Sequence, residues 1–386
     1  MQQFLSSLLQ QRKQDNLYRI RQTHSSIQSP HLLINEQSYL SFSSNDYLGL
    51  ASDARLKIAW QAGAETYGVG SGASHLITGH TQAHQILEQE LALYTKREKA
   101  LLFSTGYMAN LGVITALLGR HDAVFLDRLN HASLVDAAKL SAAKIYRYSD
   151  MQTLDHVLAK STAKHKLIVT DGVFSMDGNI ANLAKIVELA KTYAAWVMVD
   201  DAHGLGVIGE TGRGTVESYG FGTKEVPILM GTLGKSFGVF GAFIAGSELL
   251  IETLIQLARS YIYTTALPPA LIESARTSLV IITEEDWRRK QLQELISYFR
   301  KQASNLPLME SCTPIQPIIL GDSATALTVS KELYKRGIIV TAIRPPTVPK
   351  GTARLRITLS TLHTKNQIDR LIKALMEIIP NHSNII

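Results

Sequence analysis

Short apolar runs alternate with amphipathic segments through the middle of the chain, from about residue 100 to about residue 246. Runs such as Trp196–Asp200 are rich in β-favouring residues and too short for buried helices. Between the runs, apolar residues recur at helical spacing. The pattern predicts strands at Ala100–Ser104, Ala123–Leu126, Lys144–Tyr148, Leu167–Thr170, Trp196–Asp200, Ile228–Thr232 and Ala242–Ala245, and helices at Met108–Leu118, Leu134–Leu140, Met151–Lys160 and Leu183–Tyr193.

Alternation of strands and helices is typical of an α/β protein with a mostly parallel sheet that helices cover on both faces. The sequence Trp-Val-Met-Val at residues 196–199 has no polar alternation, as expected of a strand buried on both faces. Ligands of such sheets bind beyond the carboxyl ends of the strands. We therefore expect the functional residues in the loops that follow the strands.

The pattern changes towards both ends of the chain. Residues 1–45 are predicted to be an N-terminal arm whose first 20 residues form a polar amphipathic helix, and residues 46–275 a large domain. After Pro268-Pro269 come two long helical patterns, and residues 276–386 are predicted to form a smaller α+β domain. A length of 386 residues suits two domains. In the smaller domain we expect strands at Ile315–Leu320, Ile338–Ala342 and Leu355–Leu359 and a helix from about Lys365.

The composition is that of a globular protein, with 45% hydrophobic and 19% charged residues. A single cysteine, Cys312, excludes an internal disulfide and favours a reducing, cytoplasmic location. The net charge of +6 is scattered along the chain, which favours an acidic small-molecule substrate over nucleic acid. Met1–Lys13 lacks the apolar core of a signal peptide. The apolar window Pro227–Gly246 carries a central lysine and five glycines, so no membrane span is predicted.

Lys235 lies in an apolar, glycine-rich stretch, Gly231–Gly238. Burial lowers the pKa of a lysine and leaves a nucleophilic amine that condenses with carbonyl groups. Upstream, the predicted strand Trp196–Asp200 ends in an aspartate. A pyridoxal 5'-phosphate (PLP) enzyme needs this pairing, because the lysine holds the aldehyde and the carboxylate holds the pyridinium nitrogen. The sequence therefore predicts PLP as the cofactor.

Three further loops follow strands and carry polar groups suited to such a cofactor. Ser104–Asn110 enters a helix, whose start is a seat for phosphate, with Tyr107 or Asn110 adding a hydrogen bond. Ser175 and His203 are candidates for bonding the phenolic oxygen, and Thr232 for binding phosphate. The alternative for each is an ordinary turn in which polar side chains bond their own backbone.

Two other patterns are weighed and set aside. Gly68–Ala73 loosely fits a dinucleotide fingerprint, but a helix, Leu56–Tyr67, precedes it where a strand is required. Asp200 with His203 lacks an obvious third metal ligand, and so do His80 and His84, which suit a capped helix start better. No metal site is predicted.

Taken together, the motifs resemble the α-oxoamine synthases, fold-type I PLP enzymes that join an amino acid to an acyl thioester. The resemblance spans nearly the whole chain in motif order. Its motifs are Ser43–Gly49, Gly68–Ser74, Gly106-Tyr107, His131–Ser133, Asp171–Gly178, Asp200–Gly204 and Thr232–Gly238. Three positions depart from the family pattern. Asp171 stands where glutamate is frequent, Asn130 where histidine or serine is common, and Leu205 where threonine is frequent.

The resemblance implies a catalytic set of Lys235, His131, Asp200 and His203. Lys235 would carry the cofactor, Asp200 would keep its ring nitrogen protonated, and His131 would stack on its ring. The remaining cofactor contacts would be Ser175 and His203 to the phenolic oxygen, and Gly106, Tyr107 and Thr232 to the phosphate.

The resemblance also implies which residues bind the substrates. Arg356 would clamp the carboxylate of the amino acid. Arg19, Asn45, His131 and Thr347 would contact substrate, Arg19 on the acyl side. A homodimer with active sites at the subunit boundary is also implied. Thr264 or Thr265 would then reach the phosphate of the other subunit's cofactor.

Within the family, Arg344–Arg356, with its paired prolines, is similar to members that condense L-alanine with a pimeloyl thioester in biotin biosynthesis. The resemblance leaves open whether coenzyme A or an acyl-carrier protein holds the acyl group. Alternatives are glycine-using members of the 5-aminolevulinate synthase or 2-amino-3-ketobutyrate CoA ligase type, and an aminotransferase. An alternative from another class is a non-catalytic protein whose basic surface binds nucleic acid.

Overall fold

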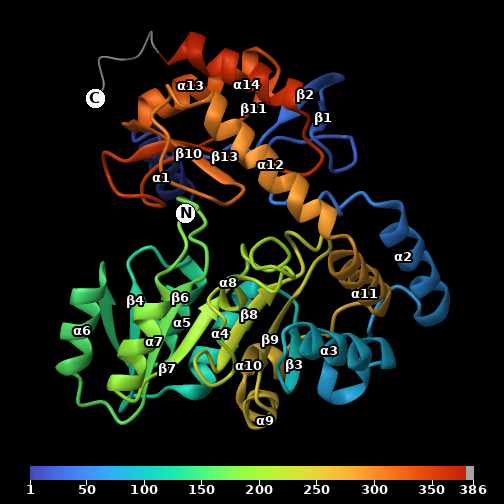
Figure 1. Cartoon of the computed structure of the whole chain (residues 1–386), viewed down its shortest axis with the longest axis vertical. Coiled ribbons are helices and arrows are strands. Elements are labelled where there is room, and N and C mark those ends of the chain that lie inside the picture. Colours follow the sequence, from blue (N-terminus) through green and yellow to red (C-terminus); the bar gives the residue numbers. More distant parts are fainter. Residues whose placement is uncertain (380–386) are drawn as a thin grey trace. The chain divides into compact units, whose positions relative to one another are not determined.

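The computed structural model describes residues 1–379, which form two compact units (Figure 1). The larger unit contains Leu48–Ser175 and Asn179–Arg289, and the smaller contains Met1–Tyr47, Met176–Gly178 and the described residues from Lys290 on. The boundary drawn from the sequence at residues 275/276 falls inside helix α11 (Pro269–Glu284), which belongs to the larger unit. Helix α11 packs against α2 (Ala54–Tyr67) and α3 (Gln82–Tyr94), which accounts for this difference.

A seven-stranded sheet forms the centre of the larger unit, counted over the described residues, and it confirms the predicted α/β class. In spatial order its strands are β3 (Lys99–Phe103), β9 (Ala242–Gly246), β8 (Ile228–Thr232), β7 (Trp196–Asp200), β6 (Lys166–Asp171), β4 (Ala123–Asp127) and β5 (Lys144–Tyr148). The pairings from β8 to β5 are parallel, and β9 runs antiparallel to both its neighbours. Each predicted strand of this region is present, with ends that differ by at most one residue.

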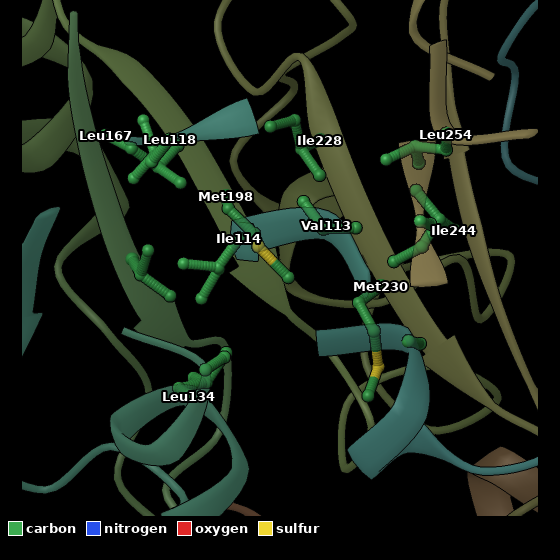
Figure 2. Close-up of a cluster of buried hydrophobic side chains, with 14 of the residues drawn as sticks. Val113, Ile114, Leu118, Leu134, Leu167, Met198, Ile228, Met230, Ile244 and Leu254 are labelled. Atoms are coloured by element: carbon green, nitrogen blue, oxygen red, sulfur yellow. The ribbon is translucent and has the colours of Figure 1, made fainter. Parts of the chain in front are cut away.

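Helices cover both faces of this sheet, as the apolar strands predicted. On one face Val113 and Ile114 pack in one cluster with Met198 and Ile228 of the sheet (Figure 2). On the other face a second cluster includes residues of α6 (Met151–Ala159) and α7 (Leu183–Thr192). The remaining helices of the larger unit are α4 (Gly106–Leu117), α5 (Ala132–Leu140), α8 (Thr215–Ser218), α9 (Glu248–Leu257) and α10 (Arg259–Ile262), with a π-helical turn at His75–Gly79.

The smaller unit joins the N-terminal residues to the C-terminal part of the chain. Its described strands form two three-stranded sheets, β1-β2-β11 and β10-β13-β12. The strands are β1 (His31–Ile34), β2 (Gln37–Ser41), β10 (Ile315–Gly321), β11 (Ile338–Ile339), β12 (Thr341–Ile343) and β13 (Ala353–Thr358). The helices are α1 (Gln2–Gln14), α13 (Ser323–Lys335), α14 (Lys365–Ile378) and the part of α12 (Asp286–Gln302) from Lys290 on. Because β11 pairs with β2, residues 1–47 fall in this unit rather than stand apart as an arm.

The single strand expected at Ile338–Ala342 is divided in the structure. Strand β11 pairs in parallel with β2, whereas β12 pairs antiparallel with β13 in the other sheet. Within the described residues, no helix is both long enough and apolar enough to cross a membrane.

Candidate active site

The predicted cofactor residues all lie in the larger unit, at or beyond the ends of its strands. Asp200 ends β7 and pairs in register with Asp171 on β6 and Met230 on β8. His131 follows β4, and its pKa responds to the charges of both Asp200 and Lys235. The structure therefore brings the lysine, the aspartate and the histidine of the predicted catalytic set into one electrostatic neighbourhood.

The carboxylate of Asp200 is buried and held by two donors. The backbone N–H of Ala202 donates to Oδ1 at 3.1 Å, and Nδ2 of Asn110 donates to Oδ2 at 2.7 Å. Asn110 is fully buried on α4 and also donates to Oγ of Ser133 at 2.9 Å. These contacts fix the direction in which the carboxylate faces, which a carboxylate must keep to hold a ring nitrogen.

The sequence suggested Asn110, beside Tyr107, as a possible contact to phosphate. Its side-chain amide goes to Asp200 instead. A signal was available, because Asn110 stands next to Ala109 and three residues before Val113, both buried on the same helix. A polar side chain on a buried helix face needs a buried partner.

His131 caps the N-terminus of α5 with its ring. Nδ1 accepts a hydrogen bond from the backbone N–H of Ser133 at 3.3 Å and lies 2.7 Å from the Oγ of that serine. Although the side chain is solvent-accessible, desolvation by surrounding protein lowers its pKa, the nearby charge of Asp200 raises it, and that of Lys235 lowers it. The neutral ring is thus held in one orientation by the helix start.

Asp171 and Asn130, two positions that depart from the family pattern, contact each other. Nδ2 of Asn130 donates to Oδ2 of Asp171 at 2.9 Å, and the backbone N–H of His131 donates to the same oxygen at 3.0 Å. Burial and repulsion by Asp200 raise the pKa of Asp171 to about 8. Asp171 therefore positions the start of α5 and is mostly protonated at neutral pH.

The turn after β8 fixes the backbone of the lysine loop. Oγ1 of Thr232 donates to the carbonyl of Gly241 at 3.0 Å and accepts from the N–H of Gly234 at 3.2 Å. The N–H of Gly238 donates to the carbonyl of Lys235 at 2.8 Å. The side chain of Lys235 is half-buried rather than fully enclosed. The amine is thus carried on a rigid turn.

The start of α4 has the form expected of a phosphate seat. Thr105 caps the helix by accepting from the N–H of Met108 at 3.1 Å, and the first N–H groups of a helix have no partner within it. A Cβ at Gly106 would lie 2.6 Å from the methyl carbon of Met230, the flexible end of that side chain. The exposed Tyr107 donates from its hydroxyl to Oδ2 of Asp136 at 2.5 Å, a contact that raises the pKa of Tyr107.

Ser175 and His203 lie beyond the ends of β6 and β7, Ser175 half-buried and His203 buried. The larger unit thus offers an amine, a buried carboxylate, an imidazole, hydroxyl groups and a helix start. In the same order, these groups suit the aldehyde, the ring nitrogen, the ring face, the phenolic oxygen and the phosphate of PLP.

Of the predicted substrate residues, His131 lies in the larger unit and the others, Arg19, Asn45, Thr347 and Arg356, lie in the smaller unit. Arg356 on β13 is buried, and its Nη1 donates to Oδ1 of Asn45 at 3.1 Å. The hydroxyl of Tyr47 donates to the same oxygen at 3.1 Å. Arg354, on the same strand, is buried in an ion pair with Asp177. Neither arginine is a solvated edge residue, since both are buried on the middle strand of the sheet β10-β13-β12.

Arg19 and Thr347 line one cavity of the smaller unit, with a volume of about 680 Å³. Arg344 and the pair Pro345-Pro346 line it as well. Desolvation lowers the pKa of Arg344, and repulsion by Arg19 lowers it further. The structure thus brings together Arg19 and the segment that carries Thr347.

Away from these residues, His80 and His84 meet His75 in a cluster. Nδ1 of His84 accepts from the N–H of Thr81 at 3.1 Å at the start of α3, and its Nε2 lies 2.7 Å from the carbonyl oxygen of Leu267. Burial is the main cause that lowers the pKa of His84 to about 4. The described residues include no group of three or more histidines, cysteines or acids arranged to hold a metal ion.

The chain is similar to proteins of known function over almost all of its length. Residues 37–375 match the family described as aminotransferase class I and II. The 8-amino-7-oxononanoate synthase of Saccharophagus degradans is 55% identical over 97% of this chain and 96% of that protein. That of Pseudomonas putida is 53% identical over 98% of each chain.

Solved structures show the same fold. A serine palmitoyltransferase from S. paucimobilis superposes with a TM-score of 0.93 at 29% identity, covering 99% of this chain and 98% of that one. An 8-amino-7-oxononanoate synthase from Francisella tularensis superposes with a TM-score of 0.78 at 35% identity, covering 89% of this chain and 98% of that one.

Proposed function

The chain belongs to the class I and II aminotransferase family and, within it, to the 8-amino-7-oxononanoate synthases, and from this premise we propose how its residues carry out the reaction. It is a PLP-dependent acyltransferase of biotin biosynthesis. The proposed reaction joins L-alanine to a pimeloyl thioester and gives 8-amino-7-oxononanoate, carbon dioxide and free thiol. The observation that carries the assignment of roles is the neighbourhood of His131, Asp200 and Lys235.

Lys235 would hold the cofactor covalently through Nζ, and the carboxylate of Asp200 would hold the proton on the ring nitrogen. When bound, PLP supplies an electron sink for the α-carbon of the amino acid. His131 would pack its neutral ring against the cofactor, and His203 and Ser175 would bond the phenolic oxygen. The start of α4 at Gly106 and Tyr107, together with Thr232, would bind the phosphate.

The amino acid would be held by its carboxylate on Arg356. A guanidinium presents a planar pair of donors that matches a carboxylate. The bond from Nη1 of Arg356 to Asn45, at 3.1 Å, supports a fixed orientation of that group. Nζ of Lys235, once released from the cofactor, would remove the α-proton as a general base and later return a proton to the same carbon.

The acyl donor would enter on the side of Arg19 and Thr347, which line the same cavity. We propose a cytoplasmic homodimer whose active sites lie at the subunit boundary, with either coenzyme A or an acyl-carrier protein delivering the acyl group. The single Cys312 fits a reducing compartment.

Steady-state thiol release tests the proposed substrates. The wild-type enzyme is assayed with alanine or glycine, each combined with pimeloyl, succinyl or acetyl thioester. The proposal predicts the highest kcat/KM for alanine with the pimeloyl thioester, and mass spectrometry should find 8-amino-7-oxononanoate as the product. A preference for glycine would instead indicate a related synthase, and pyruvate formed from alanine without any thioester would indicate an aminotransferase.

A further inference from the structure

Five cationic side chains line the cavity of about 680 Å³ in the smaller unit: Arg12, Arg19, Lys331, Lys335 and Arg344. Among the described residues no aspartate or glutamate lines it. Lys335 does form an ion pair with Glu332 at 2.6 Å, but that pair is exposed and weak. Like charges that share a cavity repel each other, so the cavity favours an anion.

The positions of these charges indicate which kind of anion the cavity would bind. Arg19 and Arg344 lie close enough for their charges to interact. Arg12 lies in the last turn of α1, and Lys331 and Lys335 lie one helical turn apart on α13. All three are exposed, whereas Arg344 is half-buried. The cations therefore extend from a partly buried position to the solvent, which suits a long ligand with charge at its outer end.

The remaining lining of the cavity is largely apolar, with Leu17, Leu327 and Ile343 among its members. A purely ionic ligand would not use this surface, whereas a ligand with an uncharged arm and a charged end would use both. An acyl thioester on a phosphopantetheine arm combines an uncharged chain with a charged end in this way. The arm is uncharged and ends in phosphate, both in coenzyme A and on an acyl-carrier protein.

We propose that this cavity binds the phosphopantetheine arm of the acyl donor, with Arg12, Lys331 and Lys335 contacting its phosphate groups. The proposal rests on the proposed function, which supplies the thioester. It extends that function by three residues that neither the sequence motifs nor the proposed chemistry uses. Arg19 and Thr347 would then lie along the route from the phosphates to the acyl group.

Direct binding to the holoenzyme tests this assignment without turnover. Isothermal titration compares coenzyme A with pantetheine, which lacks phosphate, on wild type and on the double variant Lys331→Gln/Lys335→Gln. The double variant Lys301→Gln/Lys373→Gln is the matched control, since it removes two exposed lysines of the same unit outside this cavity. We expect the Kd for coenzyme A to rise about fivefold in the first variant only, with pantetheine binding unchanged. Equal coenzyme A affinity in the two variants would overturn the assignment.

Kinetics separate the two sources of phosphate. The same variants are assayed with pimeloyl-coenzyme A, with pimeloyl carrier protein and with the pimeloyl thioester of N-acetylcysteamine, which keeps the acyl carboxylate but has no phosphate. A rise in KM for either phosphate-bearing donor, with no change in kcat or in KM for the short thioester, supports the proposal and identifies the donor that uses the site. An equal rise for the short thioester would place the acyl carboxylate on these lysines and overturn it. If wild type binds coenzyme A here but turns over no pimeloyl thioester, the proposed function fails while the cavity assignment stands.

Discussion

The orientation of Asp200 depends on one buried amide. Asn110 donates to Oδ2 at 2.7 Å, and the backbone of Ala202 donates to Oδ1 at 3.1 Å. A buried carboxylate that loses such a donor is left under-satisfied and free to rotate. The strength with which Asp200 holds a ring nitrogen should therefore depend on Asn110.

Replacing Asn110 with alanine should raise the Kd for PLP about tenfold and lower kcat about tenfold. An unsatisfied buried acceptor costs about 1–3 kcal/mol, and a tenfold effect lies within this range. The absorption spectrum of the bound cofactor should shift, because the protonation of its ring nitrogen is disturbed. Thr115→Ala is the control, since it truncates another polar side chain of α4, whose hydroxyl bonds the carbonyl of Leu111, and leaves the partners of Asp200 and His131 in place. Equal losses in the two variants would mean that Asn110 acts only through packing.

Asp171 should make stability depend on pH. Its pKa is raised from 3.8 to about 8, so the folded state binds a proton that the unfolded chain has already released. The contribution of Asp171 to the free energy of unfolding is therefore greatest below about pH 4 and falls as the pH rises towards about 8. Between pH 6 and pH 8 the wild-type protein should lose about 2 kcal/mol of unfolding free energy from this source.

Asp171→Asn cannot titrate, and its amide oxygen can still accept the bonds from Asn130 and His131. Denaturant unfolding of the cofactor-free protein at pH 6 and pH 8 should show a smaller loss of stability in this variant than in wild type. The same pH dependence in both proteins would show that Asp171 is ionised in the folded state.

At the scale of elements, the turn between β8 and β9 carries Lys235. Gly238 has φ of +67°, and a Cβ there would lie 2.4 Å from the backbone nitrogen of Ala51. The turn is thus fixed both by its own conformation and by close contact with a neighbouring segment.

Gly238→Ala should cost at least about 2 kcal/mol of unfolding free energy, because it adds a backbone clash to an unfavourable φ. Gly220→Ala is the matched control, since Gly220 has φ of +68° and nothing within 4 Å of its Cβ position. The control should lose only about 1 kcal/mol. Denaturant unfolding gives both numbers, and equal losses would rule out the contact with Ala51.

The ion pair between Arg354 and Asp177 ties β13 to the segment Met176–Gly178 within the smaller unit. Both side chains are almost fully buried, at 5% and 10% exposure. Arg354→Leu should lose about 3–5 kcal/mol, because it leaves Asp177 buried without its partner. Adding Asp177→Asn should recover part of this loss, and a double variant no more stable than the single one would contradict the account.

The strands that the sequence predicts well are those with clear physical boundaries. Ile228–Thr232 follows a proline, and Trp196–Asp200 ends at an acid, so both ends are visible in the residue pattern. The antiparallel direction of β9 is not, because an apolar run gives no direction. The apolar run of β1 (His31–Ile34) is only three residues long and β2 (Gln37–Ser41) is mostly polar, so neither strand was predicted, and β11 is only two residues long.

Residues of the candidate site are also predictable only where the local sequence marks them. Lys235, Asp200 and His131 are visible because each stands in a loop with an unusual local sequence. The partner of Asp200 is not visible locally, since Asn110 lies 90 residues away in the chain. Contacts that join distant segments depend on how the helices pack, which residue patterns do not specify.

At the scale of the whole molecule, we expect two chains to associate. All residues of α1 are at least partly exposed in the single chain, and Phe4 is 69% exposed and Leu8 46% exposed. Exposed apolar side chains on one helix are typical of a surface that another chain covers. Light scattering on the active holoenzyme should give twice the mass of the chain, and an active monomer would contradict this expectation.

The central claim is that Lys235 holds the cofactor, and borohydride reduction followed by peptide mapping tests it most directly. Reduction of the holoenzyme should fix a pyridoxyl group on the peptide that contains Lys235 and abolish activity, while Lys235→Ala should give no labelled peptide. A label on another lysine, or none on wild type after incubation with PLP, would contradict the account.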